Sequence, residues 1–212
     1  MYFDIHHHSE RKNGIFNLDL GEQIPKGYFS VGLHPQKINS NFEKDWSKIK
    51  EISLNPYCVA VGECGLDALV EADEDLQEKV FEMQILWANE IQKPVIVHCV
   101  RRFSQLLKFQ KIAKTPMIIH GFNKKENIAK DLLGKGFYLS FGKSLLYNEN
   151  LQNIAKEIPL EKIFLETDTS QEKIENIYFC LAKIKNIPLE MLQNQMLKNV
   201  EKVWGNHLKL VY

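Results

Sequence analysis

The chain has 212 residues, with 27 basic and 27 acidic side chains and a formal net charge of zero. This balance argues against a sequence-independent nucleic-acid coat protein, which carries a strong basic excess, so any affinity for a polyanion must come from a local site. The hydrophobic fraction of 44% is ordinary for a globular protein and excludes general disorder. The sequence has no linker or repeat, so we expect one domain over residues 1–212.

Strands are predicted where short apolar runs occur, and Ile15–Leu20 has the weakest pattern among them. The predicted strands are Tyr2–His6, Ile15–Leu20, Tyr28–Leu33, Cys58–Gly62, Val95–His98, Met117–His120, Phe137–Phe141 and Lys162–Leu165. Continuous apolar runs such as Val95–Val97 are typical of a parallel sheet that is buried on both faces.

Longer amphipathic stretches alternate with these strands. The predicted helices are Phe42–Leu54, Glu74–Ile91, Phe103–Lys111, Lys124–Leu133, Asn150–Ile158, Glu172–Ile184 and Leu189–Val203. The second has a clear 3.6-residue period, with Leu76, Val80 and Met83 on one stripe. The alternation predicts an α/β fold, and eight strands indicate a (β/α)₈ TIM barrel. We expect it to be shortened and distorted, because Ser9–Gly14 is too short for a helix between the first two strands. An open doubly wound sheet is the alternative.

No run of about 18 apolar residues is present, so we expect no membrane span. Residues 1–9 lack the basic start and apolar stretch of a secretory signal. The cysteines show no C-x-x-C spacing, which predicts free thiols in a reducing compartment. These observations favour a cytoplasmic protein, for which we take a monomer as the default.

Polar side chains capable of binding metal stand at the ends of the predicted strands. They are Asp4, His6, His8, His34, Glu63, His98, His120 and Asp168. In a parallel barrel the carboxyl ends of the strands share one rim, where active sites lie. We therefore expect these side chains to converge.

The first strand supplies two of the expected ligands. His6 and His8 are two residues apart, so in a strand they point to the same side and can share one ion. Imidazole nitrogen suits Zn²⁺ or Mn²⁺, and carboxylates extend the range to Mg²⁺. Asp168 could bind the same ion and act as the general base toward a water.

Glu63 follows an apolar strand, and the two oxygens of its carboxylate could bridge two ions. His98 and His120 each end another apolar strand and could ligate the second ion. We therefore predict a centre of two divalent ions, within a range of one to three, with Glu63 and Asp168 as the catalytic residues.

Each of these residues has an ordinary structural interpretation when taken alone. A histidine at a strand end is commonly a hydrogen-bonded core residue, and Asp168 could cap the next helix. The whole set would then be a row of costly buried polar groups, so joint metal binding is the better interpretation. Arg101 and Arg102 could reach a substrate phosphate, or they could form the solvated start of the next helix.

The ordered motifs resemble those of the TatD family of metal-dependent deoxyribonucleases. They are Asp4-x-His6-x-His8, Gly32–Pro35, Gly62–Asp67, Pro94–His98, His120–Phe122 and Glu166–Asp168. The pattern Gln77-x₃-Phe81-x₂-Gln84-x₃-Ala88 also matches a helix of that family, and Asn199-x₄-Trp204 resembles its closing segment.

The resemblance implies a distorted barrel of the amidohydrolase-like type. It implies that His6, His8, Glu63 and Asp168 surround one ion and that Glu63, His98 and His120 surround a second. It also implies that His34 and Glu166 lie beside the site as substrate-binding residues, with His34 near a phosphate. The implied activity is Mg²⁺- or Mn²⁺-supported hydrolysis of DNA phosphodiesters, often from an end.

The chain also departs from the family pattern. Family members are usually longer, largely in the first βα unit, and many have His-x-Arg where this chain has His98–Arg101. The longer spacing is similar to that of a short bacterial subgroup. The segment Glu71–Asp75 is short and acidic in a region where the family normally builds a substrate groove.

Three functions are consistent with these residues. Two divalent cations would outweigh the charge of Glu63 and Asp168 and leave a positive site for DNA or a small phosphoester. An amidohydrolase acting on a small amide, lactone or phosphoester is the alternative. Related barrels often use a carbamate made from lysine, whereas Glu63 stands at that place here, which favours the phosphodiesterase. A non-catalytic metal-binding protein is the third possibility.

Overall fold

The computed structural model describes residues 1–9 and 13–208, and all eight predicted strands are present in it. They are β1 (Asp4–His7), β2 (Gly14–Leu18), β3 (Phe29–Val31), β4 (Cys58–Asp67), β5 (Val95–Val100), β6 (Met117–Ile119), β7 (Tyr138–Phe141) and β8 (Ile163–Leu165). Each strand pairs in parallel with the next, in the order β1 to β8.

The first and last strands meet, which makes the sheet a nearly closed barrel. The N–H of Asp168, just beyond β8, donates to the carbonyl of His6 at 2.9 Å. The N–H of His8 donates to the carbonyl of Asp168 at 3.3 Å. The barrel prediction is therefore confirmed, and the open doubly wound sheet is excluded.

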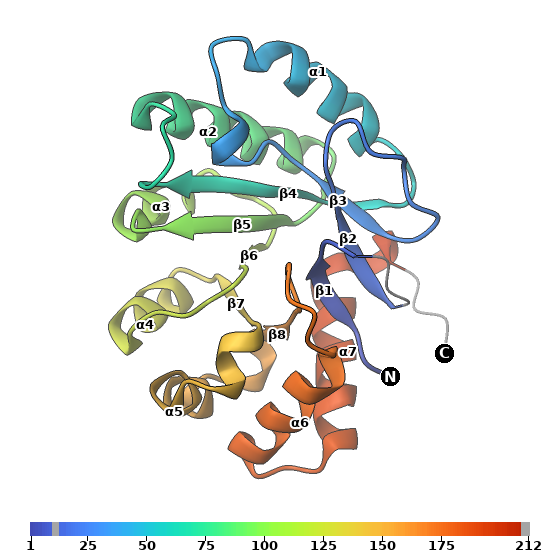
Figure 1. Ribbon diagram of the computed structural model, residues 1–212, viewed down its shortest axis with the longest axis vertical. Helices are drawn as coiled ribbons and strands as arrows, with labels where there is room; N and C mark the ends of the chain where they lie inside the picture. The colour runs from blue at the N-terminus through green and yellow to red at the C-terminus, as the bar shows by residue number, and fades with distance from the viewer. Residues whose placement is uncertain (10–12, 209–212) are drawn as a thin grey trace.

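Seven α-helices occur in the described residues, close to the predicted positions. They are α1 (Phe42–Ser53), α2 (Glu74–Glu90), α3 (Phe103–Phe109), α4 (Glu126–Gly134), α5 (Glu149–Glu157), α6 (Ile174–Lys185) and α7 (Leu189–Trp204). Helices α2 to α5 follow one another along the outside of the strands, and α6 and α7 lie together beside β8 (Figure 1). No helix among the described residues is long and apolar enough to cross a membrane.

The barrel departs from the regular pattern in its first units, as the sequence predicted. Strands β2 and β3 are joined by residues 19–28, which contain no helix. Residues 10–12, within the connection from β1 to β2, lie outside the described residues. The first helix that follows a strand and packs outside the barrel is α1, after β3.

Strand β4 is longer than predicted and passes through the region expected to end it. It continues beyond Gly62 to Asp67, so Glu63 lies inside a strand and not at its end. The pairing of β4 with β5 is irregular between Val61 and Cys64. The strands approach so closely beyond this point that a Cβ atom at Gly65 would lie 2.0 Å from the carbonyl oxygen of His98.

Apolar residues fill the barrel interior and a separate layer beneath the helices. On β6, Ile118 belongs to the inner cluster, whereas Met117 and Ile119 pack in the outer one, as the alternation along a strand requires. Trp204 from α7 joins the inner cluster and meets Phe164 edge to face at 5.4 Å between ring centroids. Helix α7 therefore contributes directly to the filling of the barrel.

Candidate metal centre

The Glu63 carboxylate lies at the centre of the polar cluster. Its side chain is 8% exposed, and its position in β4 is held by Asn17 of β2, whose Oδ1 accepts the Glu63 N–H at 2.8 Å. The same Asn17 oxygen accepts a hydrogen bond from the Ser30 hydroxyl at 3.3 Å. Two neighbouring strands thus fix the backbone that carries Glu63.

One oxygen of Glu63 faces the ligands predicted for the first ion. Its Oε2 lies 3.4 Å from His6 Nε2 and 3.7 Å from His8 Nε2. Asp168 Oδ1 lies 3.8 Å from His6 Nε2 and 3.5 Å from His8 Nε2. His6 is wholly buried, whereas the Asp168 side chain is 38% exposed, so the open side of this group is at Asp168.

The other oxygen of Glu63 faces a second set of imidazoles. Its Oε1 lies 2.7 Å from His120 Nε2, 2.8 Å from His98 Nδ1 and 3.4 Å from His34 Nε2. His98 Nδ1 and His120 Nε2 are 3.2 Å apart. The five histidines predicted from the sequence are thus divided between the two oxygens of one carboxylate.

Three sets of donor atoms lie within 4.8 Å of one another; two follow this division, and one joins His120 of the second group to His6 and Asp168 of the first. They are His6, His8 and Glu63; His6, His120 and Asp168; and His34, Glu63 and His98. Neither ring nitrogen of the buried His6 has a hydrogen-bond partner within the described residues. Such nitrogens are costly to bury unless something satisfies them, and imidazole and carboxylate donors suit divalent cations. The residues present therefore fit a metal centre.

The electrostatics of the cluster come from close opposite charges. Burial by itself raises the pKa of the Glu63 carboxyl, but the neighbouring imidazoles, chiefly His120, hold it well below its usual range. Burial lowers the pKa of His120, but Glu63 and Glu166 together raise it well above the ordinary value. The nearby Glu63 carboxylate likewise raises the pKa of His8. A bound cation would replace protons at these nitrogens.

Glu166 lies next to His120. It is wholly buried, and its Oε1 accepts the Gly121 N–H at 2.6 Å and lies 3.5 Å from His120 Nδ1. Its contact with substrate stays a prediction.

The arginines after β5 are also distinguished by the structure. Arg102 is buried and ion-paired with Glu74 at 2.9 Å and Glu78 at 2.6 Å, both on α2, so it has a structural role. Arg101 is exposed with φ of 56° directly after β5, and its contact with substrate stays a prediction. His34 lies within the cluster, at the start of a 3₁₀ helix (Pro35–Lys37).

Asp67 and Asn17 belong to the site although the sequence did not single them out. Asp67 ends β4, and its Oδ2 lies 3.0 Å from His98 Nε2. The motif Gly62–Asp67 contained it, but its contact with His98 depends on strand pairing beyond the predicted end of β4. Asn17 falls in the strand with the weakest sequence pattern, where nothing indicated an inward-pointing side chain.

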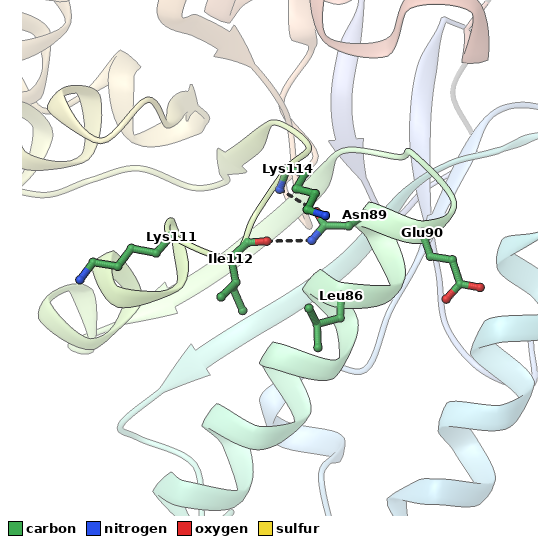
Figure 2. Close-up of a pocket in the computed structure, with 6 residues that line it drawn as sticks. All are labelled: Leu86, Asn89, Glu90, Lys111, Ile112 and Lys114. Atoms are coloured by element: carbon green, nitrogen blue, oxygen red, sulfur yellow. Dashed lines mark hydrogen bonds between the residues drawn. The ribbon is translucent and has the colours of Figure 1, made fainter.

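A surface pocket on another part of the molecule contains none of these residues. It lies between the end of α2 and the segment before β6, and it is lined by Leu86, Asn89, Glu90, Lys111, Ile112 and Lys114 (Figure 2). The Asn89 side chain donates a hydrogen bond to the carbonyl of Ile112 and accepts one from the N–H of Lys114. These bonds join α2 to the segment before β6.

The fold and the cluster together define a parallel barrel with a candidate metal centre at the carboxyl ends of its strands. The sequence model of the family described as "TatD related DNase" matches residues 9–205. The chain therefore belongs to this family. The resemblance noted in the sequence is thereby confirmed.

Curated relatives carry the names of metal-dependent hydrolases. The chain is 32% identical over 157 residues to YabD of Bacillus subtilis, named an uncharacterized metal-dependent hydrolase, with 71% of this chain and 62% of YabD aligned. It is 31% identical to YcfH of Escherichia coli K12, which has the same description, with 71% of this chain and 58% of YcfH aligned. The chain thus spans about three-fifths of the length of these relatives.

Solved structures support the fold. YjjV, a TatD homologue from Escherichia coli, superposes with a TM-score of 0.77 at 20% identity, covering 90% of this chain and 85% of YjjV. A TatD-family hydrolase from Entamoeba histolytica superposes with a TM-score of 0.76 at 16% identity, covering 96% of this chain and 98% of that protein.

Proposed function

We propose that this protein is a divalent-metal-dependent hydrolase that cleaves DNA phosphodiesters, acting as an exonuclease-like deoxyribonuclease. The observation that carries the proposal is the division of five histidines between the two oxygens of Glu63. A single carboxylate with imidazoles on both sides is suited to hold two cations close together. Membership of the family described as TatD related DNase supports the choice of DNA.

The residues near each oxygen assign the ligands. His6, His8 and Asp168 with Glu63 Oε2 would hold one cation, and His98 and His120 with Glu63 Oε1 would hold the other. The donor set of imidazoles and carboxylates suits Mn²⁺ or Zn²⁺, and the carboxylates also suit Mg²⁺. When bound, the two cations would supply an activated water and neutralise charge on a phosphate oxygen.

Asp168 is the best placed general base. It is the most exposed carboxylate of the cluster, and it lies beside His6 and His8 at the open side of the site. Its backbone closes the barrel through hydrogen bonds with His6 and His8, which fix the backbone that carries the side chain. A carboxylate held there can take a proton from an attacking water.

His34 is placed to donate a hydrogen bond to the substrate. Its Nδ1 accepts the backbone N–H of Gln36 at 3.1 Å, so a neutral ring carries its proton on Nε2. That nitrogen faces the cluster, 3.4 Å from Glu63 Oε1. In this form His34 can hydrogen-bond a phosphate oxygen and has no free lone pair at Nε2 for a cation.

The zero net charge of the chain fits this arrangement, because attraction for DNA would come from the bound cations rather than from the whole surface. The free thiols Cys58, Cys64, Cys99 and Cys180 fit a reducing compartment, and we propose the cytoplasm. The monomeric state stays a prediction, which light scattering would check.

The test is cleavage of end-labelled single- and double-stranded oligonucleotides by protein that has been stripped and refilled with Mg²⁺, Mn²⁺ or Zn²⁺. We expect metal-dependent trimming that EDTA abolishes and that Glu63→Gln lacks. The matched control is Glu90→Gln in the remote pocket, which should cleave like the wild type. A folded, metal-loaded protein that cleaves neither oligonucleotide would contradict the proposal, and small phosphoesters, lactones and amides would then test the amidohydrolase alternative.

A further inference from the structure

Helix α2 buries two different faces, and one of them carries two glutamines among its apolar residues. Leu76 and Val80 pack in the cluster shared with α1, as the apolar stripe predicted. The other buried face turns two glutamines, Gln77 and Gln84, toward the barrel, with exposed fractions of 0% and 1%. Buried amides are costly unless all their groups are bonded, so the partners of these glutamines need an explanation.

Each glutamine forms hydrogen bonds with both the N–H and the carbonyl of one residue, which lies at or just beyond the end of a strand. Gln77 Oε1 accepts the N–H of Asp67 at 2.8 Å, while Nε2 donates to the carbonyls of Asp67 at 3.0 Å and Ala72 at 2.8 Å. Gln84 Oε1 accepts the N–H of Leu33 at 2.7 Å, while Nε2 donates to the carbonyl of Leu33 at 3.1 Å. Leu33 directly precedes His34.

Asp67 connects Gln77 to the imidazole ring of His98. With its backbone clamped, its Oδ1 accepts the N–H of Leu69 at 2.8 Å and its Oδ2 lies 3.0 Å from His98 Nε2. A carboxylate only accepts hydrogen bonds, so either ring nitrogen of His98 can carry the proton while no cation is bound; with a cation held at Glu63, Asp67 is the acceptor that is left, and Nε2 carries the proton. The other ring nitrogen, Nδ1, is the one that faces Glu63 Oε1, at 2.8 Å.

We propose that α2 supports the metal centre through these two glutamines. Gln77 positions Asp67, and Asp67 holds His98 with its proton on Nε2, which leaves Nδ1 as the ligand atom of His98. Gln84 fixes the backbone before His34 and so positions that ring. All three are positioning residues, and the proposal rests on the metal-dependent function proposed above.

The contact between Asp67 and His98 separates this role from plain packing. Glutamines that only fastened α2 to the barrel would need no link to an imidazole of the site. Partners that orient a metal-binding histidine through its second nitrogen fix the tautomer of the ring, and their loss typically weakens metal affinity by about 10–100-fold.

The first test uses the wild-type protein and needs no variant. Long-range ¹H–¹⁵N correlation spectra report which ring nitrogen of each histidine carries the proton. We expect His98 to carry it on Nε2 after Zn²⁺ is added. A proton on Nδ1 of His98 in the Zn²⁺-bound protein would overturn the proposal.

The second test measures Zn²⁺ and Mn²⁺ affinity by calorimetry. Asp67→Asn should bind about tenfold or more weakly. The matched control is Asp73→Asn, an exposed carboxylate that caps α2 by accepting the N–H of Leu76 at 2.9 Å and that should bind like the wild type. Wild-type affinity in a folded Asp67→Asn would overturn the proposal.

The two glutamines provide a matched pair on one face of the same helix. Gln77→Glu removes the donors to Asp67 and should shift the ring resonances of His98 more than those of His34. Gln84→Glu should shift those of His34 more than those of His98, although the two rings are in contact, with centroids 4.4 Å apart. Equal effects of both variants on both rings would indicate general loosening of α2 and overturn the proposal. None of these measurements uses a nucleic-acid substrate, so failure of the proposed deoxyribonuclease activity would be distinguishable.

Discussion

Glu63 has a different neighbour set at each of its carboxylate oxygens. Oε2 faces His6 and His8, and Oε1 faces His98 and His120. If Glu63 contacted only one of these two groups, the imidazoles of the other group would lie close together with no negative charge between them. The arrangement therefore makes both halves of the site depend on one residue, while Asp168 belongs to the first half alone.

Asp168 should matter more for turnover than for substrate binding. Loss of a general base typically lowers the rate by about 10²–10⁴-fold. We expect Asp168→Asn to lower kcat for a small phosphodiester within that range and to change KM little, because Glu63, His6 and His8 still hold the first cation. Steady-state kinetics in saturating Mn²⁺ would check this. A kcat within about twofold of the wild type would assign the base elsewhere.

At the scale of the elements, the meeting of β4 and β5 brings Glu63 and His98 together. Gly65 has φ of 150°, and a side chain there would collide with the His98 carbonyl. We expect Gly65→Ala to lower the melting temperature strongly and to weaken Mn²⁺ binding, because His98 must move. The control is Gly134→Ala at the end of α4, where a Cβ meets nothing within 4 Å and stability should be equal or higher.

Two measurements test the prediction for Gly65→Ala. Differential scanning calorimetry gives the stability of both variants, and calorimetric titration gives their affinity for Mn²⁺. If Gly65→Ala bound Mn²⁺ like the wild type, the close approach of β4 and β5 would not be needed for the position of His98.

The elements could be predicted because apolar runs and amphipathic stretches have different periods. The strand-end residues His6, His98 and His120 followed from those runs and from the shared rim of a parallel barrel. Two features could not be predicted. Strand β4 continues through Gly62 and Gly65, which usually weaken strands, so the contact of Asp67 with His98 was hidden. Which buried face of α2 meets the barrel depends on tertiary packing.

At the scale of the whole molecule, α7 completes the barrel interior with Trp204. This ring is 1% exposed and packs against Phe164 in the inner cluster, and its Nε1 has no hydrogen-bond partner within the described residues. Truncation of a buried tryptophan to alanine costs about 3–5 kcal/mol. We expect Trp204→Ala to lose stability in that range by urea unfolding, and Trp204→Phe to lose clearly less because no hydrogen bond is removed. Equal losses of stability in Trp204→Ala and Trp204→Phe would show that Trp204 does not stabilise the protein by filling the barrel.

The proposed activity depends on two cations held on the two sides of Glu63. The most direct measurement is a crystal structure of Mn²⁺-soaked protein with an anomalous difference map, for the wild type and for Glu63→Gln. We predict two peaks in the wild type, one beside His6, His8 and Asp168 and the other beside His98 and His120, with at least one lost in the variant. A single peak or none in the wild type, or two undiminished peaks in Glu63→Gln, would contradict the shared-carboxylate centre.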